Sequence, residues 1–138
     1  MPAFEYACPL RWSDMDAFGH VNNVQYLRYL EDARVAMFLE PPPDERAFTL
    51  DGDVVVARHE IDYLRPLVYR RAPVPLRVRV TKIGGASFTL AYTMGEQSTP
   101  YITASTVLAA FDQATGRARR LRPAERDWLG TYLEPSPV

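Results

Sequence analysis

The chain is poor in cysteine and contains no long apolar run. Cys8 is the single cysteine among 138 residues, so no disulfide can form within the chain, and the cytoplasm is the default compartment. The longest apolar run, residues 106–111, is much shorter than the roughly 18 residues that span a bilayer. Residues 1–12 also lack the basic start and the apolar stretch of a secretory signal. These absences predict a cytoplasmic protein without a membrane span, in which Cys8 is a buried structural thiol.

The chain also lacks an excess of either charge. It has 16 basic and 17 acidic side chains and a formal net charge of -1, which argues against a general binder of nucleic acid or of membrane surfaces. Hydrophobic residues make up 47% of the sequence, as expected for a globular protein. Because the sequence has no repeats, low-complexity tracts or linkers, it predicts one domain over residues 1–138.

The N-terminal part of the chain changes from a strand pattern to a helix pattern. Residues 4–12 alternate apolar and polar side chains, which predicts a half-buried strand, and Pro9 should place it at a sheet edge or create a bulge. Asn22 or Asn23 is expected to cap a following helix, which the subsequent prolines end. This helix is predicted over residues 24–40, with one apolar face made by Tyr26, Leu30, Ala33 and Met37.

Residues 54–121 have the pattern of a β-sheet. Four strands are expected in a meander with a hairpin at Gly84–Gly85, and a short helix should begin near Pro123. One long helix covers only one side of such a sheet, so the expected fold is α+β, and apolar residues on the other side predict a partner subunit. His59 is expected to be a core histidine with its hydrogen bonds satisfied. No metal site is predicted, because no other His, Cys or acid lies at ligand spacing from it.

The segment 13–23, SDMDAFGHVNN, carries more polar chemistry than a connection between a strand and a helix needs. Asp16 lies a few residues before the predicted helix start, where free backbone N–H groups and the positive end of the helix dipole gather. Gly19 allows the backbone to turn tightly. The ordinary alternative is that Asp14 and Asp16 are turn formers and that His20 is a loop histidine.

Residues 13–34 resemble the signature of hotdog-fold thioesterases, the 4-hydroxybenzoyl-CoA thioesterase and YbgC/FadM-like group. The shared features are a D-x-D pair, a glycine, His-Val-Asn-Asn, and an aromatic residue and an arginine on the long helix. The order of the predicted elements is also similar, so the resemblance covers almost the whole chain. It implies an antiparallel sheet wrapped around one long central helix, and hydrolysis of an acyl-CoA thioester to the free acid and coenzyme A.

The resemblance also implies roles for individual residues. Asp16, the second acid of the pair, would be the general base or the nucleophile, and Asp14 would serve structure. His20 would take part in the chemistry or orient the substrate, although Phe18 stands where plant acyl-carrier thioesterases have a helpful asparagine. Asn23 stands where some YbgC-like members have a histidine proposed as catalytic, so that role is absent here. The backbone N–H of Asn23 is instead the candidate oxyanion donor. Gly19 and Tyr26 are expected to line the substrate site, with core packing as the alternative for the tyrosine.

The phosphates of coenzyme A need cations, and seven arginines occur in two short stretches. We expect four of them to bind the phosphates: Arg65, Arg117, Arg119 and Arg120. The alternative is that they and their neighbours Arg70, Arg71 and Arg122 form a solvated basic rim. Glu31 and Arg34 are interpreted as an ordinary helix pair at i,i+3 spacing.

Three functions are compatible with these residues. The leading one is an acyl-CoA thioesterase. The second is an acyl-carrier-protein thioesterase, whose basic rim would dock an acidic partner. The third is a non-hydrolytic acyl-CoA-binding module, against which Asp16 argues, because a binder gains nothing from a carboxylate beside a thioester. No cofactor is expected, since coenzyme A would be part of the substrate, and the expected assembly is a homodimer or homotetramer.

Overall fold

The structure, a computed structural model, describes residues 3–48 and 53–134 and consists of a long helix against an antiparallel sheet. Two short 3₁₀ helices, η1 (Trp12–Asp14) and η2 (Pro43–Glu45), flank the long helix. In chain order the other elements are β1 (Phe4–Cys8), α1 (Gln25–Leu39), β2 (Val54–Tyr63), β3 (Val74–Ile83), β4 (Ser87–Glu96), β5 (Thr99–Asp112), β6 (Arg117–Ala118) and α2 (Pro123–Gly130).

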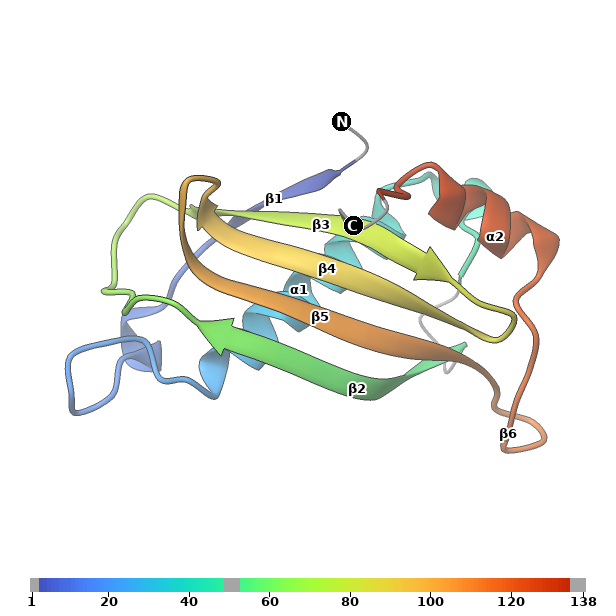
Figure 1. Cartoon of the computed structure of the whole chain (residues 1–138), viewed down its shortest axis with the longest axis horizontal. Coiled ribbons are helices and arrows are strands. Elements are labelled where there is room, and N and C mark those ends of the chain that lie inside the picture. The colour runs from blue at the N-terminus through green and yellow to red at the C-terminus, as the bar shows by residue number, and fades with distance from the viewer. Residues whose placement is uncertain (1–2, 49–52, 135–138) are drawn as a thin grey trace.

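The sheet has the strand order β1-β3-β4-β5-β2, and β6 pairs with β5 (Figure 1). All pairings are antiparallel, and β3, β4 and β5 form the expected meander. The prediction of a four-strand meander is wrong for β2, which pairs with β5 at the opposite edge from β1. The long connection 64–73 explains the difference, because a tight turn would have forced β2 and β3 to be neighbours.

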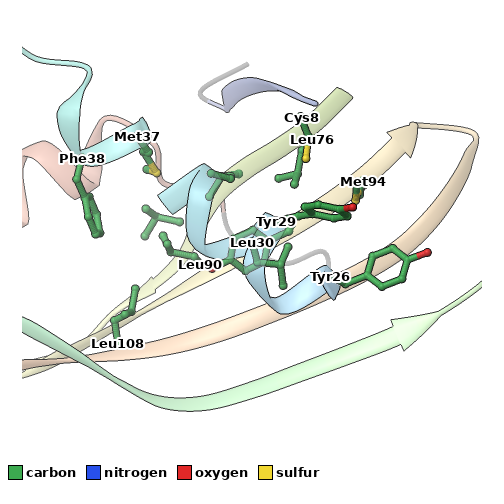
Figure 2. Close-up of a cluster of buried hydrophobic side chains, with 14 of the residues drawn as sticks. Cys8, Tyr26, Tyr29, Leu30, Met37, Phe38, Leu76, Leu90, Met94 and Leu108 are labelled. Carbon is green, nitrogen blue, oxygen red and sulfur yellow. The ribbon is translucent and has the colours of Figure 1, made fainter. Parts of the chain in front are cut away.

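The core lies between α1 and the sheet. Leu30, Ala33 and Met37 on one face of α1 are fully buried, and the sheet contributes Leu76, Leu90, Met94 and Leu108 (Figure 2). Figure 1 shows α1 crossing one face of the sheet, which curls around it. The predicted architecture, an α+β hotdog fold with an antiparallel sheet wrapped around one long central helix, is confirmed.

Two boundaries depart from the sequence pattern. The first strand ends at Cys8 rather than continuing to residue 12, because Pro9 cannot donate a ladder hydrogen bond. The strand does lie at a sheet edge, as Pro9 predicted. The long helix begins at Gln25, one residue later than expected, and the side chain of Asn22 accepts the N–H of Val24 at 3.1 Å just before it.

The two single-residue expectations for Cys8 and His59 have different outcomes. Cys8 is buried, and burial raises the pKa of its thiol to about 12, which fits a structural thiol. His59 is exposed on β2, so its predicted place in the core is wrong, and the reason is that β2 is an edge strand. Its Nδ1 atom nevertheless lies 2.9 Å from Oγ1 of Thr106.

Within the described ranges, no helix is both long and apolar enough to cross a membrane. The prediction of a single domain over residues 1–138 includes positions outside those ranges and stays a prediction.

Candidate active site

The segment between β1 and α1 folds into a compact loop. Met15 and Val21 form an isolated antiparallel bridge, and between them the N–H of Gly19 donates to the carbonyl of Asp16 at 3.1 Å. Gly19 has a φ of 83°, and a Cβ there would meet nothing within 4 Å. The glycine is therefore required by backbone conformation and not by lack of space.

Asp14 anchors this loop to the helix. It is buried, and its Oδ2 atom accepts the hydroxyl of Tyr29, one turn into α1, at 2.7 Å. Its carbonyl accepts the N–H of Asn22 at 2.9 Å, so both ends of the loop meet at this residue. Burial and the bond to Asp14 raise the pKa of Tyr29, which keeps its hydroxyl a donor. Asp14 thus has the structural role that was expected.

Asp16 lies half-buried at the start of the turn. Its Oδ1 atom accepts the N–H of Phe18 at 2.9 Å, which orients the carboxylate and leaves Oδ2 without a recorded partner among the described residues. Asp16 lines a pocket of about 480 Å³ at the N-terminal end of α1. The other lining residues are Phe18, His20, Val21, Asn23, Tyr26, Tyr63, Leu64, Arg65 and Pro66.

The pocket therefore brings together the predicted residues of segment 13–23 with Tyr26 and Arg65. Gly19 shapes the turn that carries Asp16, although it does not line the pocket itself. Tyr63 and Leu64, the last residue of β2 and the residue after it, also line the pocket and were not predicted from the sequence. The apolar side chains of these two residues were the one signal in the sequence. No local pattern shows that the end of β2 lies opposite the start of α1.

Asn23 provides a hydrogen-bond donor at this pocket. Its carbonyl accepts the hydroxyl of Tyr63 at 2.9 Å, which fixes the peptide. Its own N–H has no acceptor among residues 3–48 and 53–134, whereas the N–H groups of Asn22, Val24 and Gln25 are all bonded. A free N–H at a helix start, where the dipole is positive, is suited to bind an oxygen that becomes negative.

Tyr26 forms the inner wall of the pocket. It is 3% exposed and packs edge to face on Tyr63 with ring centroids 5.4 Å apart. Burial, with smaller contributions from Tyr63 and Tyr101, raises the pKa of Tyr26 to about 12. Tyr26 is therefore both a core residue and a lining residue, so the two roles considered for it are compatible.

Arg65 is held in place at the rim of the pocket. Its Nε and Nη2 atoms donate to the carbonyl of Thr99 at 3.0 and 2.7 Å, and the guanidinium lies 3.9 Å from the ring centroid of Tyr101. The guanidinium remains exposed beside these contacts. Its charge is therefore available to an anion near the pocket.

Arg117, Arg119 and Arg120 lie elsewhere. They belong to β6 and the segment after it, at the opposite end of the sheet from the loop that carries Asp16 (Figure 1). None of the three lines the pocket, so one chain does not combine them with Arg65 in a single phosphate site. The linear sequence could not reveal this separation, which follows from the length and direction of β5.

Arg119 takes part in an ion network within the fold. Its guanidinium donates to both carboxylate oxygens of Glu125 at 2.8 Å and lies 3.4 Å from Oδ1 of Asp53. Glu125 is fully buried and also accepts the N–H of Arg122 at 2.7 Å. This ion network connects α2 to the residue before β2.

Among the residues that the structure describes, no group of three or more His, Cys, Asp or Glu side chains is placed to hold a metal ion.

A sheet curled around one long helix is the architecture of the hotdog fold. Residues 10–129 match the thioesterase-like superfamily, and the chain belongs to this family. It is accordingly a thioester hydrolase, as the resemblance predicted.

Individual proteins are similar to this chain. The uncharacterized protein YsmA of Bacillus subtilis (strain 168) is 31% identical over 123 residues, which are 87% of this chain and 80% of YsmA. A predicted thioesterase from Bacillus stearothermophilus has the same fold with a TM-score of 0.83 at 22% identity, covering 98% of this chain and 99% of the other. A thioesterase from Thermus thermophilus, whose structure is complexed with coenzyme A and Zn, is 30% identical with a TM-score of 0.76. That similarity covers 93% of this chain and 92% of the other.

The first prediction concerns the anchor of the loop. Tyr29→Phe keeps the ring but leaves the buried Asp14 oxygen without its donor, which typically costs about 1–3 kcal/mol. We expect the free energy of unfolding in urea to fall by this amount. Tyr63→Phe, which removes a hydroxyl from an exposed bond, should cost less than about 1 kcal/mol. Equal stability of Tyr29→Phe and the parent would show that the bond does not hold the loop.

The second prediction concerns the ion network. Glu125→Ala leaves Arg119 without its main partner inside the fold, and breaking a buried pair in this way costs about 3–5 kcal/mol. The matched control is Glu5→Ala, which removes an exposed pair with Arg77 and should cost about 0–1 kcal/mol. Thermal and urea unfolding of both variants measure the difference, and similar losses would contradict a structural role for Glu125.

Proposed function

We propose that this thioester hydrolase acts on acyl-CoA, with Asp16 as the general base or the nucleophile. The observation that carries the proposal is the pocket at the start of α1, where Asp16 and His20 lie with Asn23 and its free N–H. Hydrolysis needs a group that activates water or attacks the thioester, and donors for the developing oxyanion. These residues supply both.

As a general base, Asp16 takes a proton from a water molecule, whose oxygen attacks the thioester carbonyl carbon. The negative charge that develops on the carbonyl oxygen is stabilised by the N–H of Asn23 and the helix dipole. The carbon–sulfur bond then breaks, the acid leaves, and the coenzyme A thiolate takes up the proton. As a nucleophile, Asp16 instead attacks the carbonyl carbon, and the carbon–sulfur bond breaks to release the coenzyme A thiolate. Water then hydrolyses the resulting anhydride to the free acid and the Asp16 carboxylate, and its proton goes to the thiolate.

The remaining pocket residues would bind and orient the substrate. Tyr26, Tyr63 and Leu64 provide apolar surface for the acyl group, and His20 lies on the same pocket as a substrate-orienting or catalytic side chain. Arg65 provides a cation at the rim, which suits a phosphate of coenzyme A. The coenzyme A bound to the Thermus thermophilus relative supports a nucleotide substrate over an acyl-carrier protein.

The decisive experiment replaces Asp16 by Asn, which keeps the size of the side chain and an acceptor oxygen for Phe18. Loss of a general base typically lowers the rate by about 10²–10⁴-fold. We expect kcat to fall by this factor, while a non-hydrolysable acyl-CoA analogue still binds. Asp14→Asn is the matched control, and it should affect stability more than kcat because Asp14 bonds Tyr29.

A rate near that of the parent for Asp16→Asn, or a larger loss of kcat for Asp14→Asn, would refute this role of Asp16. Label in the Asp16 carboxylate after a single turnover in water enriched in heavy oxygen would identify the nucleophilic route with attack of water on the Asp16 carbonyl of the anhydride, because the general-base route leaves this carboxylate unlabelled. Comparing acyl-CoA with the same acyl group on a carrier protein tests the substrate.

We further propose that the protein forms a homodimer or a homotetramer. Among the described residues β2 pairs only with β5, so its other edge is free, and it exposes Val55, Val56 and Tyr63. An unpaired strand edge with apolar side chains is a surface that proteins normally cover. Light scattering at micromolar concentration should give at least twice the 15.7 kDa mass of the chain. A mass equal to that of one chain would refute the proposal.

A further inference from the structure

The surface of the chain is hollowed between α1 and β2, beside the free edge of β2. The pocket there has a volume of about 320 Å³ and is lined by Glu31 and Arg34 of α1 and by Val56 and His59 of β2. Val56 and its neighbour in the pocket wall, Leu27, are exposed apolar side chains. A homodimer that forms along the free edge of β2 would enclose this pocket between its two copies.

Arg34 is a buried cation without an anion. It is only 7% exposed, and its recorded hydrogen bond within the described part of the chain runs from Nη1 to the hydroxyl of Tyr92 at 3.3 Å. Among the described residues, no carboxylate lies within 4.0 Å of its guanidinium, and this includes Glu31. The expected helix pair of Glu31 and Arg34 within one chain is therefore absent. A guanidinium taken out of water without an anion is costly, and a carboxylate that enters the pocket offsets that cost.

Glu31 carries the opposite charge on the wall of the same pocket. Its side chain is exposed, and no ion pair involves its carboxylate among residues 3–48 and 53–134. One helix therefore presents an anion without a cation three residues before a cation without an anion. Such a surface is complementary in charge to a second copy of itself.

A two-fold axis brings the two charges together. Antiparallel pairing of two β2 strands over Val54–Tyr63 places the axis beside the middle of the strand, near His59, which lines the same pocket. The two α1 helices then run antiparallel on either side of the axis, so their residues meet in reversed order. Because a contact about a two-fold axis is reciprocal, this order sets Glu31 of each copy opposite Arg34 of the other.

We propose that the pocket receives Glu31 of a second copy of the chain, and that its carboxylate forms an ion pair with Arg34. The planar guanidinium matches a carboxylate, and the exposed side chains of Leu27 and Val56 supply the apolar surround that excludes water from such a pair. Arg28 also lines the pocket, but it is exposed, so water already stabilises its charge and a partner adds little. The pair exists only between two copies and therefore rests on the proposed homodimer.

The first test is the dissociation constant of the dimer, measured by analytical ultracentrifugation over a range of concentrations. Glu31→Gln changes an exposed side chain, so each chain still folds, but Arg34 of the other copy is left buried without its anion. Loss of one partner of such a pair typically weakens binding by at least about 30-fold, and we expect the Kd to rise by this factor or more.

Asp32→Asn is the matched control for this test. It removes the same charge from the next exposed residue of α1. Asp32 lies on the side of the helix toward β1, where burial and then the charge of Asp32 raise the pKa of the Cys8 thiol. We expect Asp32→Asn to dimerise like the parent.

The second test shows whether the pair forms between chains. Glu31→Gln and Arg34→Gln are mixed in equal amounts, one of them labelled with ¹⁵N, and the dimers are counted by native mass spectrometry. Neither homodimer of these variants contains an intact pair, whereas the mixed dimer contains one. A coupling of about 10-fold, at the low end for close charge pairs across an interface, makes about 90% of the dimers mixed, and random pairing gives about half. An effect of Arg34 on its own chain alone would not favour the mixed dimer.

Each outcome decides the proposal. A Glu31→Gln dimer as tight as that of the parent overturns it, whether or not Arg34→Gln folds. Random pairing of Glu31→Gln with Arg34→Gln, or an excess of mixed dimers with Arg28→Gln in place of Arg34→Gln, overturns the pair and leaves the homodimer standing. A parent chain that is monomeric at micromolar concentration overturns the pair and the homodimer together, while the effect of Asp16→Asn on kcat still tests the reaction.

Discussion

Burial of one face of α1 against the curled sheet is the contact on which the other features depend. Leu30, Ala33 and Met37 lose all solvent exposure there, and a helix is too stiff to bury these residues without fixing its first turn as well. The free N–H of Asn23 consequently has a fixed position relative to the end of β2. Two hydrogen bonds hold the loop before it in place. The hydroxyl of Tyr29 donates to the carboxylate of Asp14, and the N–H of Val21 donates to the carbonyl of Leu67. The core therefore places Asp16, although Asp16 itself contributes nothing to the core.

The two acids of segment 13–23 show how environment separates chemical roles. Asp14 is buried, and one of its carboxylate oxygens accepts the hydroxyl of Tyr29. A substitution of Asp14 is therefore expected to affect the stability of the fold first. Asp16, two residues on, is half-buried, bonded to one backbone N–H and open to a pocket. An acid that reacts has to reach water and substrate, whereas an acid that anchors has to exclude them.

The arginines divide in a similar way. Arg119 is neutralised inside the fold by Glu125 and Asp53, and Arg65 is steadied by a carbonyl and an aromatic ring while its charge stays exposed. Arg34 is buried, and its recorded hydrogen bond within the described part of the chain is to a hydroxyl. Because the free energy of burying a charge depends on its partner, identical side chains lie in environments that their number in the sequence does not reveal.

The sequence alone determined the elements and the chemistry that is local to them. The apolar period predicted α1 to within one residue at each end, and Pro9 predicted an edge strand, because both signals act between near neighbours in the chain. The motif in segment 13–23 likewise identified the family and the loop that carries Asp16. Only the tertiary structure decided that β2 pairs with β5, that Tyr63 completes the pocket, and that Arg119 faces Glu125 at the far end of the sheet. It also decided that Arg34 meets Tyr92 instead of Glu31. These outcomes depend on which distant segments the sheet brings together, and no local pattern of residues carries that information.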